Sequence, residues 1–337
     1  MTTVRLTLDE AGALAHRALV ANGLDHANAQ AVCDRMMQAE RDRCPSHGLF
    51  RVPWYAKGVA CGRVNGAADP VVSRLAPSVL KVDGDRGYAP LGQARGLGPL
   101  GDLARETGIA ALAFTNMFHI AAMWPEVEAL AEQGFCAFAF TAAYPYVAPA
   151  GGKSPVYGTN PMGFAWPRRD GPPRVLDQAS SAMARGEIQI AARDGHTLPE
   201  GTGIGPDGAS TTDPNIVLEG AQLAFGGYKG AALAMMIELL AGPLIGEHLS
   251  FEAKEDDRGA GGPPKGGELI LALDPRHFGD PDGFIDHGEA LFARIMAEEG
   301  PRLPGMRRYA ARAETPTTGI TIPEALHREI VQLASGA

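Results

Sequence analysis

Five short apolar runs in the middle of the chain, each bounded by Gly, Pro or Asp, constrain its fold more than any other sequence feature. Short apolar runs between turn residues are typical of buried β-strands. Two stretches between them, AAMWPEVEALAEQG and KGAALAMMIELLAGPLIG, have the length of helices, and the second is apolar enough for a core helix. We therefore expect an α/β or α+β fold around one buried sheet. The five runs are IAALAFT, GFCAFAFTA, MGFAW, RVLDQ and ELILALD.

Helical patterns dominate roughly the first sixty residues. Thr7 and Glu10 have the spacing of a capping box, and apolar residues then recur at helical intervals. Similar spacing predicts a second helix over 26–42 and a third that begins near Ser46. The stretch EAKEDDRGAGGPPKGG, at 252–267, is first charged and then rich in Gly and Pro, so we expect a mobile surface loop there.

Length and charge limit what these elements can do. A chain of 337 residues is long enough for roughly two domains, and its net charge is −9. An acidic chain of this kind is a poor nucleic-acid binder, so we expect no nucleic-acid partner. The N-terminal residues lack the apolar core of a signal peptide, and no segment has about 18 uninterrupted apolar residues. We therefore expect a cytoplasmic protein without a membrane span.

The histidines and cysteines give no sign of a metal site. The histidines have no ligand spacing such as H-x-x-x-H, so we expect no bound metal. No C-x-x-C pair occurs, and the four cysteines are most simply free thiols. They are Cys33, Cys44, Cys61 and Cys136.

The stretch GLGPLG, at 96–101, matches G-x-G-x-x-G, the spacing of a dinucleotide-binding turn. A working turn of that kind directly follows a strand and opens a helix. Here the preceding residues, GDRGYAPLGQAR, do not have a strand pattern, and Pro99 lies inside the motif. We therefore expect a Gly-rich helix that leads into DLARETG.

The segment PSHGLFR contains residues suited to acid–base chemistry. Ser46 can cap a helix, with His47 in the first turn and Arg51 four residues further on the same face. An imidazole transfers protons near neutral pH, and a guanidinium holds a carboxylate with two parallel hydrogen bonds. The plainer alternative is a helix cap followed by a surface histidine, and the residues alone favour that alternative.

Three further segments contain turn residues. In GGYKG, at 226–230, Lys229 lies at the start of an apolar helix, where its ammonium group and backbone amides can meet a phosphate or carboxylate. A solvated lysine after a glycine turn is the alternative. YGTNPMG and STTDP contain Asn-Pro and Asp-Pro pairs, which by themselves indicate tight loops.

Taken together, these segments have the order and spacing of a known family. The chain resembles the malate/L-lactate dehydrogenase family of the ureidoglycolate and sulfolactate dehydrogenase type over nearly its whole length. In particular, it resembles the bacterial reductases of Δ1-piperideine-2-carboxylate and Δ1-pyrroline-2-carboxylate. The resemblance rests on PSHGLFRVPWY, FHIAAMWPEVEALAEQGFCAFAFT, VAPAGG, YGTNPMGFAWPR, LDQASSAMARGEIQIAARDG, STTDP, FGGYKGAALAMMIELLAG and RLPGMRRY.

The resemblance implies a mixed α/β, non-Rossmann nicotinamide-binding fold with a large, mostly antiparallel sheet flanked by helices. The implied domains are a helical part over 1–75 with the Ser-His motif, a cofactor-binding sheet domain over 76–275, and a helical part over 276–337 that packs with the first. The resemblance also implies a homodimer with sites near the subunit contact.

The resemblance further implies NADPH as cofactor, with NADH as an alternative. His119 has an alternative interpretation, in which it is a loop histidine that makes no cofactor contact. The implied cofactor contacts are His119, Ile120, Ala121, Ala122, Met123, Asp177, Gln178, Ala179, Lys229, Gly305, Met306, Arg307 and Arg308.

The implied activity is reduction of a cyclic imino acid. This reaction needs a hydride for the carbon, a proton for the nitrogen and a group that holds the carboxylate. By the resemblance, His47 donates the proton with Ser46 beside it, and Arg51 holds the carboxylate. The remaining implied substrate contacts are Thr159, Arg185 and Gly186.

Glu187 bears on the choice of substrate. The similar reductases have an aspartate at this position as the third member of a Ser-His-acid relay, whereas many 2-hydroxy-acid dehydrogenases of the family have a lysine. A carboxylate near His47 favours its protonated form and favours a cationic iminium over a neutral ketone. The alternative is a surface glutamate that starts the amphipathic run IQIAAR.

Two other functions remain open. One is a 2-keto acid reductase, or 2-hydroxy acid dehydrogenase, with the same fold and cofactor, against which Glu187 argues. The other is an inactive relative that binds only a nucleotide or a partner. That second function predicts loss of the proton donor or of the phosphate contact, yet Ser46, His47, Arg51 and Lys229 are all present.

Overall fold

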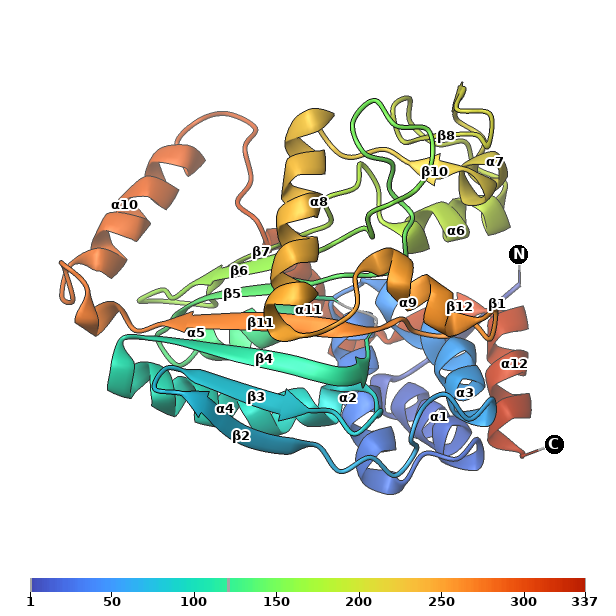
Figure 1. Ribbon diagram of the computed structural model, residues 1–337, viewed down its shortest axis with the longest axis horizontal. Coiled ribbons are helices and arrows are strands. Elements are labelled where there is room, and N and C mark those ends of the chain that lie inside the picture. Colours follow the sequence, from blue (N-terminus) through green and yellow to red (C-terminus); the bar gives the residue numbers. More distant parts are fainter. Residues whose placement is uncertain (1, 120–121, 337) are drawn as a thin grey trace.

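The computed structural model describes residues 2–119 and 122–336, and its centre is a seven-stranded sheet (Figure 1). The strand order is β2-β3-β4-β11-β5-β6-β7, and all neighbours are antiparallel except the parallel pair β3–β4. The strands are β2 (Val71–Ala76), β3 (Val79–Asp83), β4 (Ile109–Phe118), β5 (Cys136–Thr141), β6 (Met162–Trp166), β7 (Arg174–Gln178) and β11 (Lys265–Leu273).

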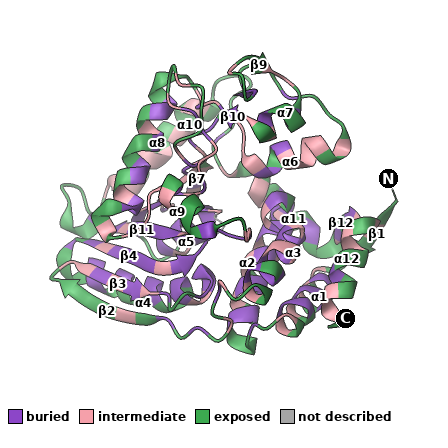
Figure 2. Ribbon diagram, turned by 45° about the vertical axis from the view of Figure 1, so that its right-hand side comes forward, coloured by how far each residue is buried: buried purple, intermediate pink, exposed green. Residues whose placement is uncertain are grey.

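Both faces of this sheet are covered, which explains why its inner strands are continuously apolar. In β5, Ala137 and Ala139 belong to the core under α4 (Ala89–Thr107) and α5 (Trp124–Ala131). Phe138 and Phe140 point to the opposite face, where Phe140 packs with Ile237 of α8 (Tyr228–Ala241). Figure 2 shows the buried residues gathered along the sheet and its covering helices.

The two ends of the chain meet in a helical region beside the sheet. Strand β1 (Thr3–Leu6) pairs antiparallel with β12 (Ile320–Pro323), and both termini lie on the same side of the molecule (Figure 1). The Thr7–Glu10 capping box starts the first helix, as predicted. The helices of this region are α1 (Leu8–Ala21), α2 (His26–Arg41), α3 (Val52–Ala60), α11 (Met306–Thr318) and α12 (Glu324–Ala334).

Two smaller parts complete the fold. A three-stranded sheet, ordered β10-β8-β9, lies beside α6 and α7. Helix α10 (Phe284–Met296) extends from the body of the protein, contains no buried residue, and contacts β6 through Phe284 and Trp166 (Figure 1). The division of the chain into three domains, with boundaries at 75 and 275, remains a prediction. The smaller elements are β8 (Gly203–Ile204), β9 (Ser210–Thr211), β10 (Ala221–Gln222), α6 (Arg185–Asp194) and α7 (Pro214–Glu219).

The predicted central elements are confirmed. The five apolar runs form β4, β5, β6, β7 and β11, and the two apolar helical stretches contain α5 and α8. GLGPLG lies inside α4, where a side chain at Gly96 would collide with Leu112 and Val82 of the sheet. Gly96 therefore serves close packing of a helix on a sheet.

Two local predictions are wrong, and the first is the helix expected near Ser46. No helix begins at Ser46: two 3-10 turns, Pro45–His47 and Leu49–Arg51, precede α3. The cause is the Glu40 carboxylate, which accepts the backbone N–H of Leu49 at 2.7 Å and occupies the space that a side chain at Gly48 would need.

The segment 252–267 is also more ordered than expected. Its charged half belongs to α9 (Ser250–Asp257), and its last residues begin β11. Glu252 accepts the backbone N–H of Leu249 at 2.8 Å, and the buried Asp257 pairs with Arg63 at 2.6 Å. These contacts hold a charged sequence in a helix.

Candidate active site

A cleft of about 370 Å³ lies where the 3-10 turns at 45–51, the start of α6 and the ends of β5 and β7 meet. Segments distant in the sequence therefore supply one site. Of the residues predicted from sequence, those that line it are Ser46, His47, Arg51, His119, Thr159, Asp177, Gln178, Ala179, Arg185, Gly186, Glu187 and Arg308.

The imidazole of His47 is held from two sides. Ser46 Oγ lies 3.0 Å from Nδ1 of His47, and the Trp124 ring meets the imidazole edge to face at 6.4 Å between centroids. The hydroxyl and the indole together keep the ring in one orientation in the cleft. This is the arrangement that a proton donor needs, because proton transfer depends on geometry first.

Arg51 supplies a buried positive charge beside this histidine. Its side chain stacks on Trp54 at 4.9 Å, and its Nε donates to the backbone oxygen of Ser46 at 2.7 Å. Burial lowers the pKa of Arg51 to about 10, so the guanidinium stays charged at neutral pH. A cation in such surroundings favours an anionic ligand such as a carboxylate.

Gly186 allows the two motif segments to meet. A Cβ at this position would lie 2.8 Å from a terminal nitrogen of Arg51 and 2.9 Å from Cβ of Ser46. Helix α6 begins one residue earlier, at Arg185, so its N-terminal end faces the cleft. The partial positive charge of a helix N-terminus adds to the attraction for an anion.

The remaining predicted substrate contacts lie at the same cleft. The Arg185 side chain donates to the backbone oxygen of Leu218 at 2.9 Å and stacks on Tyr146 at 4.3 Å. The backbone oxygen of Thr159 accepts a hydrogen bond from the Ser180 amide at 2.8 Å. Thr159 is thereby held at the cleft wall.

Glu187 is exposed in the first turn of α6 and lines this cleft. It therefore shares a solvent-accessible site with His47, rather than standing on a remote surface. The relay geometry expected from the resemblance remains a prediction.

Asp177 organises the turn before α5. Its carboxylate accepts the backbone N–H groups of Met123 at 2.9 Å and Trp124 at 3.1 Å, and thus caps that helix. Burial raises the pKa of Asp177 to about 6 in spite of these hydrogen bonds. Met123 is buried and Ala122 is half-buried. The predicted contacts Ile120 and Ala121 lie outside the described residues.

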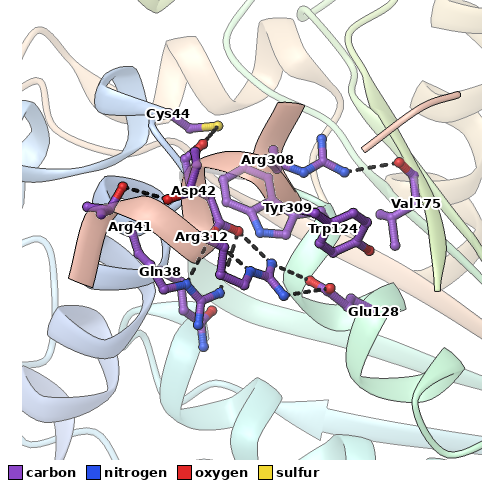
Figure 3. A network of polar contacts seen from close by, with 12 residues as sticks. Gln38, Arg41, Asp42, Cys44, Trp124, Glu128, Val175, Arg308, Tyr309 and Arg312 are labelled. Carbon is purple, nitrogen blue, oxygen red and sulfur yellow. Dashed lines mark hydrogen bonds and ion pairs between the residues drawn. The ribbon is translucent and has the colours of Figure 1, made fainter. Parts of the chain in front are cut away.

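A second cleft of about 820 Å³ continues from the first. The two share Arg43, Cys44, Asp177, Gln178, Glu187 and Arg308. Arg308 stacks on Trp124 at 5.2 Å and donates to the backbone oxygen of Val175 at 3.0 Å (Figure 3). The arginines that line the second cleft are Arg43, Arg302, Arg307 and Arg308.

Arg312 joins three elements beside this cleft. Its guanidinium pairs with Asp42, after α2, at 2.6 Å and with Glu128 of α5 at 2.8 Å (Figure 3). Helix α11, which contains the predicted contacts Arg307 and Arg308, is thereby tied to the turn before His47 and to α5.

The second cleft fits the phosphates of a dinucleotide. Its guanidinium groups are suited to phosphate oxygens, and the first cleft has room beyond them for a nicotinamide ring. Of the predicted cofactor contacts, Gly305 and Arg307 line this cleft, whereas Ala122, Met123, Met306 and Lys229 line neither cleft. Within 2–119 and 122–336, no group of three His, Cys, Asp or Glu side chains is placed to hold a metal ion.

Several lining residues were not predicted from the sequence. They are mainly aromatic or apolar and come from separate parts of the chain, namely α3, α5, β5, the segment after β5, and α6, so no spacing marks them as a group. Only the two tyrosines of YPY, at 144–146, form a local pattern that could have indicated some of these residues. The residues are Trp54, Trp124, Thr141, Tyr144, Tyr146 and Ile190.

The fold and the comparisons with known proteins identify an oxidoreductase. The chain belongs to the malate/L-lactate dehydrogenase family, whose model matches residues 6–331.

Three relatives indicate where it lies within that family. The Δ1-pyrroline-2-carboxylate/Δ1-piperideine-2-carboxylate reductase of Pseudomonas aeruginosa is 46% identical over 98% of this chain and 99% of its own. The (2R)-3-sulfolactate dehydrogenase (NADP+) of Chromohalobacter salexigens is 41% identical over 96% of each chain. The crystal structure of Δ1-piperideine-2-carboxylate reductase from Pseudomonas syringae has a TM-score of 0.92, at 38% identity over 98% of this chain and 100% of its own.

Proposed function

We propose that this protein reduces cyclic imino acids, converting Δ1-piperideine-2-carboxylate to L-pipecolate and Δ1-pyrroline-2-carboxylate to L-proline. Full-length similarity to reductases of these two substrates supports the proposal. The observation that carries it is the presence of Ser46, His47, Arg51 and Glu187 at one cleft. These residues supply a proton donor, a carboxylate clamp and a negative charge.

Arg51 holds the substrate carboxylate, helped by the N-terminal end of α6 at Arg185 and Gly186. The buried guanidinium and the helix N-terminus both attract a negative group. Holding the carboxylate turns one face of the imine toward the hydride donor. Most of the gain in rate comes from this orientation.

His47 donates the proton that the ring nitrogen gains. Its contact with Ser46 keeps the imidazole oriented for the transfer. Glu187 acts on the same step through charge, since a nearby carboxylate stabilises both an imidazolium and a cationic iminium. A lysine at this position would disfavour both cations and would suit a keto acid instead.

NADPH is the proposed cofactor, and when bound it supplies the hydride. Its phosphates would lie against the guanidinium groups of the second cleft, and its nicotinamide end would lie near His119 and Asp177. The NADP-dependence of the sulfolactate dehydrogenase relative supports NADPH over NADH. Lys229, which is exposed at the start of α8, remains a predicted cofactor contact.

A homodimer in the cytoplasm is the proposed state of the protein. Helix α8 packs on the sheet through Ile237, and its outer face exposes large apolar side chains. The segment Tyr228–Ile245 is long and apolar enough to cross a membrane, but 39% of it is buried against the rest of the protein. An apolar face of this kind is suited to a second subunit. The side chains are Tyr228, Met235, Met236 and Leu239.

A 2-keto acid reductase is the second candidate, supported by the 41% identity to a sulfolactate dehydrogenase. Initial rates with Δ1-piperideine-2-carboxylate, pyruvate and oxaloacetate, each with NADPH and NADH, separate the two functions. The proposal predicts that the imine with NADPH is the fastest pair. It also predicts that Glu187→Lys lowers imine turnover relative to keto acid turnover. Faster reduction of a keto acid by the unaltered protein contradicts the proposal.

A further inference from the structure

A small cavity of about 30 Å³ lies beside His47. His47 and His119 line both this cavity and the substrate cleft. The volume is sufficient for a water molecule, provided that polar atoms surround it. The cavity therefore provides a connection from His47 into the protein interior.

The surroundings of this cavity are polar. Gln93 Oε1, His119 Nδ1 and Glu126 Oε2 are buried and have no hydrogen-bond partner among the residues that the structure describes. All three residues line the cavity. Buried polar atoms of native proteins are almost always paired, often through water. These atoms give a water molecule in the cavity the partners that it needs.

Two buried carboxyl groups lie at this cluster. Glu126, on α5, is 1% exposed, and Glu268, on β11, is fully buried. Arg35 on α2 pairs with Glu126 at 3.2 Å, and Gln93 on α4 donates to Glu268 at 2.8 Å. Burial raises the pKa of both carboxyl groups, and the charge of Glu126 raises that of Glu268 further. Arg35 is the one cation that these contacts place beside the two acids, so a proton kept on one of the two carboxyl groups would balance the charge of the pair.

His119 joins the carboxyl pair to the active-site side. Its Nε2 lies 3.5 Å from Glu268 Oε2 and 3.4 Å from the Gln93 amide nitrogen. Burial, and then the positive charges of Arg35 and His47, lower the pKa of His119 to about 3. His119 is therefore neutral at physiological pH, and the contact of its Nε2 with Glu268 is not a contact with an imidazolium. The other titratable groups that face the cluster are Tyr55, which lines the cavity, and Asp177, whose charge acts on Glu126.

We propose that the Glu126–Glu268 pair is a buried proton store that restores the proton of His47 after each turnover, through water in the cavity. The inference rests on the proposed function. In the reduction, the ring carbon gains the hydride, the ring nitrogen gains a proton from the His47 imidazolium, and His47 is left neutral. A proton then passes from the carboxylic acid of Glu268 to Nε2 of His119, and Nδ1 of His119 gives its own proton to the water in the cavity. The water in turn passes a proton to His47. The pair is left with one further negative charge beside Arg35, and solvent returns the lost proton when the cleft opens. Glu126 and Glu268 are positioning residues in this sense, since they act through His47.

The test compares Glu126→Gln and Glu268→Gln with Glu128→Gln in the full-length protein. Glu128 is a matched control, because it is also buried on α5 but pairs with Arg312 outside the cavity. We expect each of the two test variants to lower kcat for the imine about tenfold, with KM for the imine unchanged. Restoring the His47 proton then limits the rate. The isotope effect from nicotinamide deuterated at the transferred position should therefore fall toward one, while the solvent deuterium effect increases.

A third variant tests the cavity without altering any titratable group. Val32→Ile adds a methyl group to the cavity wall, and we expect the same pattern of isotope effects as for the glutamine variants. If kcat and both isotope effects match those of the unaltered protein in all three variants, the proton store is wrong. If the unaltered protein does not reduce the imine at all, the proposed function has failed instead.

A measurement without turnover keeps the inference testable if a variant is poorly folded. Infrared spectra of the unaltered protein at neutral pH should contain the carbonyl band of a buried, protonated carboxylic acid. Glu268→Gln should lose one component of this band and Glu128→Gln should keep it, whereas the component from Glu40, whose pKa is raised to about 7, should remain in both variants. Identical carbonyl bands in the unaltered protein and Glu268→Gln overturn the proposal.

Discussion

Ser46 Oγ lies 3.0 Å from Nδ1 of His47, so a hydroxyl from the preceding residue orients the imidazole at the cleft. If His47 is the proton donor, its replacement removes acid catalysis, whereas loss of the hydroxyl only loosens the ring. We predict that His47→Ala lowers kcat for the imine by about 10²- to 10⁴-fold and Ser46→Ala by about tenfold. Stopped-flow measurement of NADPH oxidation checks both. Undiminished imine reduction by His47→Ala rules out this donor.

Gly186 lies against both Arg51 and Ser46, and a methyl group at this position has no room. We predict that Gly186→Ala raises KM for the imine about tenfold, equivalent to about 1.4 kcal/mol, because the guanidinium is displaced. The effect on kcat should be smaller. Gly98→Ala is the matched control, since a Cβ at that helical position contacts nothing within 4 Å. Equal KM values for the two variants would contradict the assigned role of Arg51.

Glu40 makes the stability of the protein depend on pH. Burial raises the pKa of Glu40 from 4.5 to about 7. Because the folded-state pKa is the higher one, the contribution of Glu40 to stability is complete below about pH 4.5 and is lost as the pH rises through 7. We predict that the free energy of unfolding falls over this range by up to about 3 kcal/mol more in the unaltered protein than in Glu40→Gln.

Urea unfolding at several pH values measures this difference directly. Asp177, whose pKa is also raised, contributes a slope of the same sign to both proteins, so the comparison isolates Glu40. Parallel pH profiles for the two proteins would show that the Glu40 carboxyl is not neutral in the folded state.

The proposed dimer can be tested by a substitution on the outer face of α8. Leu239 is 54% exposed there, near Met235 one turn earlier. We predict that the unaltered protein elutes and scatters light as a dimer, and that Leu239→Glu shifts it toward monomer, because a charge at an apolar contact is costly. The control is Leu291→Glu, an equally exposed leucine on α10, which should leave the dimer intact. A monomeric unaltered protein contradicts the proposal.

The sequence predicted the strands from β4 to β7 in the sheet order well and missed β3 and β2 at the other edge. Helices cover both faces of β4, β5 and β11, so their sequences are continuously apolar and easy to recognise. Strand β2 lies at the edge, where Val71 and Leu75 are largely exposed. Its mixed sequence, VVSRLA, lacks the pattern that identified the others.

The site was predictable where a short motif carried the chemistry. Ser46, His47 and Arg51 are close in sequence, and the structure brings them to one cleft. The error over the helix at Ser46 arose because Glu40, from the preceding helix, interrupts the backbone there. No local pattern shows such a contact.

Buried charged residues were the least predictable feature. Glu126 and Glu268 look like surface positions of a helix and a strand, and their burial depends on Arg35 and Gln93 from two other helices. Only the tertiary structure brings these four together behind His47.

The central claim is that the protein reduces a cyclic C=N bond. The most direct measurement is the product formed from Δ1-piperideine-2-carboxylate and NADPH, analysed by chiral chromatography together with the amount of NADPH consumed. We predict one L-pipecolate for each NADPH oxidised, and L-proline from the five-membered substrate. NADPH consumption without pipecolate, together with rapid conversion of pyruvate or oxaloacetate to the hydroxy acid, would contradict the claim and identify a 2-hydroxy acid dehydrogenase.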